Sequence, residues 1–120
     1  GAGVLYRFDG LSASYNFLGL VKQDQGDLAG AERAYQQYNA IMLALTQRAP
    51  DNANWQRELY VSHLNFGDLR EQQNDWTAAA EQYAQALAVA EKLQQADKLN
   101  AEDKGHVNLI RAALRRVRAK

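Results

Sequence analysis

Residues 55–97, WQRELYVSHLNFGDLREQQNDWTAAAEQYAQALAVAEKLQQAD, decide the fold of this chain. The first half has the three-and-four spacing of one helix face at Trp55, Leu59, Ser62, His63, Phe66 and Leu69. The second half has the same spacing at Trp76, Ala79, Ala80, Tyr83, Leu87, Ala90 and Leu93. Between them, Asn74 tolerates the left-handed conformation that ends a helix, and Asp75 is a favoured N-cap for the next one. The stretch therefore predicts two helices folded against each other across one short turn.

The same pattern occurs once more, 48 residues earlier in the chain. When Gly19 is placed on Gly67, the matching pairs are Leu11 with Leu59, Ser14 with Ser62, Leu18 with Phe66, Asp27 with Asp75, Ala31 with Ala79, Tyr35 with Tyr83 and Leu45 with Leu93. At the turn, Gly26 falls on Asn74, and Gly and Asn most readily adopt a positive φ at a helix C-cap. A repeat of this length built from paired helices is typical of an α-solenoid.

These residues resemble the tetratricopeptide repeat family. Its pattern of Leu-Gly, Ala and an aromatic residue is matched twice, by Leu18, Gly19, Ala31 and Tyr35 and by Phe66, Gly67, Ala79 and Tyr83. The match is similar to the long-period variety found in large bacterial signalling and scaffold proteins, and it covers the chain from about Leu11 onward. The departures are Lys22 and Arg70 where the family has Tyr, Tyr38 where it has Ala, and a proline displaced to Pro50.

The resemblance implies an all-α fold with about five antiparallel helices. They would form an α-solenoid of two and a half tetratricopeptide-like helix-turn-helix repeats in a right-handed superhelix. Within a single domain over residues 1–120, we expect repeat 1 at about 4–50, repeat 2 at about 51–98 and a C-terminal capping helix at about 100–118.

Composition supports an all-helical chain and excludes several function classes. Hydrophobic residues make up 47% of the 120 residues, which is enough for a continuous core, and there is one proline. The formal net charge is zero, so no global field favours nucleic acid. Cysteine is absent, which excludes disulfides and thiolate metal sites. No apolar run approaches the ~20 residues that span a bilayer. The compartment is not fixed, although the cytoplasm is favoured.

The remaining helices are predicted at 12–25, 27–49 and from about 100 to 118. The first is expected to pack through Leu11, Tyr15, Leu18, Gly19 and Lys22, and the second through Tyr35, Tyr38, Met42 and Leu45. Candidate N-caps after Pro50 are Asp51, Asn52 and Asn54, and Asn100 with Asp103 resembles a capping box. The last helix has an apolar stripe at Val107, Ile110, Leu114 and Val117 and a polar outer face at Arg111, Arg115 and Arg118.

No catalytic motif, phosphate loop or metal-ligand spacing is found, so we predict neither an enzyme nor a cofactor or metal site. His63 is expected to be a hydrogen-bonded core histidine, and His106 to be solvated. Asp68 and Glu71 lie three residues apart and are interpreted as a solvated helix face, because acid–base catalysis needs a pocket that shifts one pKa. From Lys104 onward there are six basic residues and no acidic one, which complements a helix C-terminus and is weak evidence for nucleic acid.

The family resemblance also implies a concave peptide-binding groove. Carried over residue by residue, its positions are Ala13, Asn16, Phe17, Leu20, Gln23, Val61, Leu64, Asn65, Asp68 and Glu71. Asn65 matches the asparagine that in the family bonds the backbone of a bound peptide. The cationic pair that grips a terminal carboxylate is missing, since Leu109 and Ala113 occupy those places. The groove therefore favours a segment with an apolar anchor and a nearby Lys or Arg.

The resulting hypothesis is a non-catalytic protein–protein interaction module, a scaffold or adaptor that forms part of a larger protein and binds a peptide or partner protein. The alternative is a self-association module. Two copies would then pair through the apolar N-terminal residues Val4, Leu5, Tyr6 and Phe8, or through the Val107 stripe of the last helix. Mass in solution discriminates between these two hypotheses.

Overall fold

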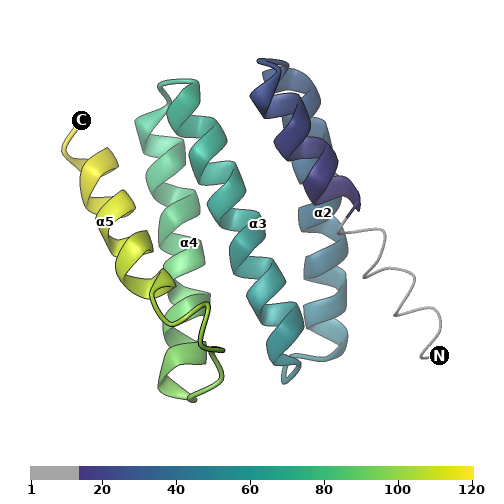
Figure 1. Cartoon of the computed structure of the whole chain (residues 1–120), viewed down its shortest axis with the longest axis vertical. Helices are drawn as coiled ribbons and strands as arrows, with labels where there is room; N and C mark the ends of the chain where they lie inside the picture. Colours follow the sequence, from purple (N-terminus) through teal and green to yellow (C-terminus); the bar gives the residue numbers. More distant parts are fainter. Residues whose placement is uncertain (1–13) are drawn as a thin grey trace.

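A computed structural model of the chain describes residues 14–120 (Figure 1). Within this range residues 14–24 are helical, here called the N-terminal helix, and four helices follow: α2 (Leu28–Arg48), α3 (Ala53–Gln72), α4 (Trp76–Gln95) and α5 (His106–Arg118). The described residues contain no strand, which confirms the all-α class for this part of the chain. The predictions that involve residues 4–8, Leu11, Ser12 and Ala13 lie outside the described residues.

The helix ends follow the predicted turn chemistry. Gly26 and Asn74 have φ values of 80° and 60°, the left-handed conformation expected at both positions. After Asn74, the N–H of Asp75 bonds the carbonyl of Arg70 at 2.9 Å, which closes the last turn of α3. Asp75 then caps α4 by accepting the N–H of Ala78, as Asp27 caps α2. Of the three N-cap candidates before α3, Asn52 is the one used.

Helices that follow one another in the sequence lie side by side, so that α3 lies between α2 and α4, and α5 covers the far side of α4 (Figure 1). The core runs along these contacts. The predicted stripes are buried, at Tyr35, Tyr38, Met42, Leu45, Leu59, Phe66, Leu69, Ala79, Tyr83, Val107, Ile110, Leu114 and Val117. The small residues Ala86 and Ala90 of α4 are fully buried as well, which lets α5 approach this helix closely.

A close contact between a glycine and a tyrosine occurs twice, at positions 48 residues apart. A Cβ atom at Gly67 would lie 2.5 Å from the ring of Tyr83, and one at Gly19 would collide in the same way with Tyr35. The hydroxyl of Tyr35 donates to Gln23 at 2.8 Å, and that of Tyr83 donates to Glu71 at 2.6 Å. The sequence recurrence therefore extends to equivalent tertiary contacts.

The last helix begins at His106, later than the predicted start at about residue 100. Asn100 does accept the N–H of Asp103 at 2.9 Å, as expected of a capping residue. The Asp103 carboxylate, however, points inward and is held by Arg57 of α3, so it does not complete the capping box. Residues 101–105 form turns around this buried carboxylate, and α5 starts after them.

Two further expectations are wrong. His106 is not fully solvated: its side chain is 27% exposed, and its Nδ1 lies 2.6 Å from the hydroxyl of the fully buried Tyr60. Leu18 is 44% exposed although it was expected on the packed side. Its counterpart Phe66 packs edge-on against Tyr35 of the preceding helix, and no described helix precedes Leu18. His63 is a buried, hydrogen-bonded histidine as predicted, and desolvation lowers its pKa.

Candidate functional site

The N-terminal helix and α3 are joined through residues of the predicted groove. The amide of Asn65 donates to the side-chain oxygen of Asn16, and Gln23 donates to Gln72 at 2.9 Å. These bonds place the two helices side by side, as the repeat requires. The bond to Asn16 uses one amide hydrogen of Asn65, which leaves its carbonyl oxygen and second hydrogen available to a peptide backbone.

The apolar groove residues divide into an exposed and a packed group. Phe17 is 69% exposed and Leu20 is 45% exposed. Val61 and Leu64 are partly buried because they pack against the core around Tyr60. A large part of the apolar surface of this face therefore remains open to solvent at the N-terminal helix.

Leu109 of α5 is a further exposed apolar residue. It is 67% exposed and takes the place that Val61 has one repeat earlier. Ala113, one turn further along α5, is partly buried against the core. Of the two residues that replace the missing cationic pair, Leu109 is thus the one that offers exposed apolar surface.

The acidic end of the groove is not a simple solvated face, contrary to our interpretation of Asp68 and Glu71. The Tyr83 hydroxyl lies 2.5 Å from an oxygen of Asp68 and 2.6 Å from an oxygen of Glu71, so its one hydrogen is shared between the two carboxylates. Arg116 of α5 reaches Glu71, with Nη2 at 2.5 Å and Nε at 3.3 Å from its oxygens. This cluster connects α3, α4 and α5 through polar contacts.

The electrostatics of the cluster differ between its two carboxylates. The hydrogen bond from Arg116 lowers the pKa of Glu71. Desolvation raises the pKa of Asp68, although the residue as a whole is exposed, and the bond from Tyr83 partly offsets this effect. No salt bridge to Asp68 is found among residues 14–120, so within this cluster Asp68 is the carboxylate without a cationic partner.

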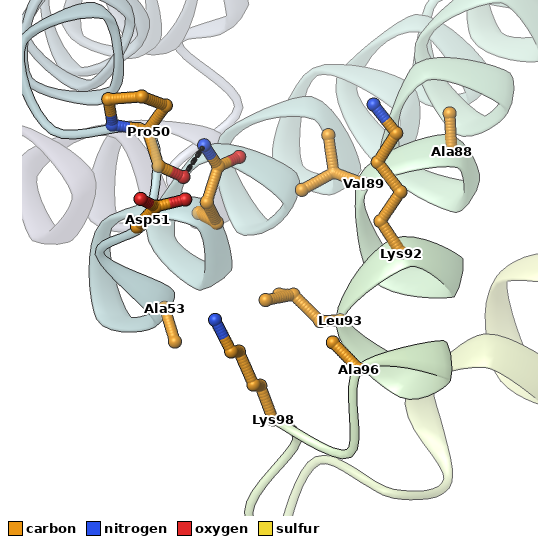
Figure 2. Close-up of a pocket in the computed structure, with 10 residues that line it drawn as sticks. Pro50, Asp51, Ala53, Ala88, Val89, Lys92, Leu93, Ala96 and Lys98 are labelled. Atoms are coloured by element: carbon orange, nitrogen blue, oxygen red, sulfur yellow. Dashed lines mark hydrogen bonds between the residues drawn. The ribbon is translucent and has the colours of Figure 1, made fainter.

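A separate pocket of about 330 Å³ lies where α3 begins and α4 ends (Figure 2). Its floor is apolar, and Lys98 reaches toward Ala53 and Leu93. None of the nine described groove residues lines it. Sequence reasoning missed this pocket, although the small residues that surround Leu93 were a usable signal: Ala53, Ala88 and Ala96.

A second polar cluster was also missed, and it fixes the approach to α5. Asp103 is 2% exposed, is held by Arg57, and has its Oδ1 3.6 Å from Nδ1 of His106. Burial raises the pKa of Tyr60, whose hydroxyl contacts His106, to about 12. The contacts in this cluster position α5 against α3 and face the interior rather than a ligand.

No family model, curated protein or solved structure matches the chain. In the part that the structure describes, no helix is both long and apolar enough to cross a membrane. Among the same residues, no group of three or more His, Asp or Glu side chains could hold a metal ion.

Proposed function

We propose that this chain is a tetratricopeptide-like α-solenoid of two and a half repeats, with antiparallel helices in a right-handed superhelix. Its function would be that of a non-catalytic scaffold or adaptor module within a larger protein. The recurrence of turn, cap and glycine–tyrosine contact at 48-residue spacing supports the architecture. The binding face consists of the N-terminal helix, α3 and α5, here called the groove face.

One observation carries the functional part of the proposal. The two most exposed of the large hydrophobic side chains among the described residues, Phe17 and Leu109, both occupy positions of the groove face. Leu20 is a third exposed residue on it. Exposed apolar surface gathered on one face marks a contact site more often than isolated exposed residues do.

The partner that fits this face is an extended or helical segment with apolar anchors. Phe17 and Leu109 would contact the anchors, and Asn65 would bond the backbone of the segment. A Lys or Arg of the partner would pair with Asp68, because Glu71 is already neutralised by Arg116. An acidic tail with a terminal carboxylate is disfavoured, since Arg116, the cation that lies beside the groove residues, is already paired with Glu71.

A peptide-array screen compares the wild type with the double variant Phe17→Ser, Leu109→Ser. Both residues are exposed, so the substitutions leave the core intact. Loss of a central anchor costs about 1–2 kcal/mol or more, so we expect binding of the selected peptides to fall at least about tenfold. Leu43→Ser is the matched control, because Leu43 is 41% exposed on α2, away from the groove face. Equal binding by the double variant and the wild type would contradict the proposal.

Self-association remains the second candidate, because a second copy could also cover Phe17 and Leu109. It would not use the Val107 stripe, which is buried inside the chain. Sedimentation over a hundredfold range of concentration separates the two candidates. The peptide-binding proposal predicts a monomer throughout. A dimer that the Phe17→Ser, Leu109→Ser variant dissociates would support self-association instead.

A further inference from the structure

The contact between α2 and α3 includes an ion pair that the next contact of the same kind lacks. Arg70 of α3 donates to Glu32 of α2 at 2.5 Å, and its guanidinium lies over the ring of Phe66. Both side chains of the ion pair are partly exposed, at 24% for Arg70 and 30% for Glu32. The pair thus bridges the two helices at the surface.

The residues that lie 48 positions after those of the α2–α3 contact fall on α4 and α5 and form the equivalent contact there. Arg70 becomes Arg118, so the cation is retained, but Glu32 becomes Ala80. Gln36 likewise becomes Ala84. The second contact therefore keeps its arginine and loses both the carboxylate that would pair with it and the bulk of two long side chains.

A hollow of about 490 Å³ occupies this place at the edge of the molecule, where α5 lies beside α4 (Figure 1). Its lining is Trp76, Thr77, Ala80, Glu81, Ala84, Val117, Arg118 and Lys120. We call it the α4–α5 hollow. The walls combine an aromatic ring and small apolar side chains with two cations and one carboxylate.

The cations of the hollow lack carboxylate partners within residues 14–120. Arg111 pairs with Glu91 and Arg116 pairs with Glu71, but no salt bridge involves Arg118 or Lys120. The ammonium group of Lys120 instead lies 5.3 Å from the ring centroid of Trp76. The hollow therefore presents two cations without a salt-bridge partner among the described residues, beside an apolar wall.

We propose that the α4–α5 hollow binds an acidic segment of a partner protein, in which a Glu or Asp neighbours an apolar residue. The carboxylate pairs with Arg118 as Glu32 pairs with Arg70, and the apolar side chain packs on Trp76 and Ala80. This site is distinct from the groove face and has the opposite charge preference.

The first test supplies the missing carboxylate within the chain itself. Ala80→Glu should melt about 2–4 °C higher than the control Ala80→Gln, which has the same size without the charge. In an Arg118→Ala background the difference between Glu and Gln should vanish. Equal melting temperatures of the two variants with Arg118 present would overturn the inferred equivalence with Arg70.

The second test measures binding by amide chemical shifts of the full chain. The probe is an N-acetylated, C-amidated Leu-Glu-Leu-Glu-Leu peptide, and the control probe replaces both Glu by Gln. We expect the acidic probe to shift the Trp76 indole and the Val117 amide. Ala80→Glu and Arg118→Ala should each weaken this binding at least about tenfold. Arg115→Ala, on the same helix but outside the lining, should leave it within about twofold.

Three results would overturn the proposal. Equal binding of the Gln probe would remove the charge argument, and equal shifts with sodium acetate alone would reduce the hollow to an adventitious anion site. A concentration-dependent mass that Ala80→Glu abolishes would show that a second copy fills the hollow. The Phe17→Ser, Leu109→Ser variant leaves the α4–α5 hollow intact. Loss of array-peptide binding by this variant therefore tests the groove face alone, and loss of acidic-probe binding by Arg118→Ala tests the hollow alone.

Discussion

Gly67 is a single residue on which the packing of α3 against α4 depends. A Cβ atom there would lie 2.5 Å from the ring of Tyr83, which is fully buried. The ring has no freedom to retreat, because Asp68 and Glu71 hold its hydroxyl.

Gly67→Ala should therefore destabilise the protein by about 1–3 kcal/mol, as overpacked sites do. The sign is informative, since the same substitution at a free helical position stabilises by roughly 0.5–1 kcal/mol. Gly105→Ala at the N-cap of α5 is a control without the clash, because no atom lies within 4 Å of a Cβ there, and it should cost no more than about 1 kcal/mol. Urea denaturation measures both, and a Gly67→Ala variant as stable as the wild type would show that the register of the two helices is wrong.

Asp68 should make the protein less stable as it ionises. Desolvation raises its pKa above the ordinary 3.8, so the folded state favours the protonated form. Stability is then lost as the pH rises from the unfolded pKa through the folded one. Asp68→Asn removes this cost and should be as stable as the wild type or up to about 1 kcal/mol more stable at pH 7. The stability advantage of Asp68→Asn should disappear below about pH 4. Thermal melts of both proteins between pH 3 and pH 7 measure this difference. A lower melting temperature of Asp68→Asn at pH 7 would refute the prediction.

Glu71 should show the opposite dependence. The bond from Arg116 lowers its pKa below 4.5, so its contribution to stability is present above the unfolded pKa and is lost as the pH falls through the folded one. Arg116 is 52% exposed, so solvent weakens the pair, and Glu71→Gln should cost no more than about 1 kcal/mol at pH 7. The same melts test it, and a cost that persists unchanged at pH 3 would rule out the ion pair as its cause.

At the scale of the elements, the start of α5 depends on Asp103. Its buried carboxylate is held by Arg57, and residues 101–105 turn around it. Asp103→Ala should destabilise by about 1–3 kcal/mol, because Arg57 loses a charged hydrogen-bond partner but is exposed enough to regain water. Hydrogen exchange should accelerate in the first turn of α5 more than in α3. Exchange that remains unchanged at α5 would mean that Asp103 does not fix this helix.

The sequence predicted those features that rest on local chemistry. Asn74 and Asp75 indicated the turn between α3 and α4 because each needs only its neighbours to act. The start of α5 was wrong because Asp103 contacts Arg57, which is 46 residues away. His106 was misplaced for the same reason, since no spacing rule connects it with Tyr60.

In the candidate site too, features set by the local repeat pattern were predicted and features set by long-range contacts were not. The repeat placed Phe17 and Leu109 on equivalent helices, and both are exposed, while the groove itself stays a prediction. The pairing of Glu71 with Arg116 was not foreseen, because it depends on how α5 packs across α3. A comparison of positions 48 residues apart shows from the sequence alone that Ala80 stands where the earlier repeat has Glu32. That this removes the partner of an arginine became clear only from the observed bond between Glu32 and Arg70.

At the scale of the whole molecule, α5 closes the core formed by α3 and α4. Its Val107 stripe covers Tyr60, Ala86 and Ala90, which are fully buried. Deleting residues 103–120 should expose this surface, so the truncated chain should aggregate or unfold without a cooperative transition. Deleting residues 119–120 alone is the control. A soluble truncation that melts as cooperatively as the wild type would show that α5 is not a cap.

The central claim is that the N-terminal helix, α3 and α5 form one binding face. The measurement that tests it most directly is an amide chemical-shift map of the full chain, titrated with the tightest peptide from the array. The account predicts the largest changes at residues 16–23, at 61–71 and around Leu109, with Asn65 among them. Changes confined to α2 and α4, or to the pocket around Leu93, would contradict it.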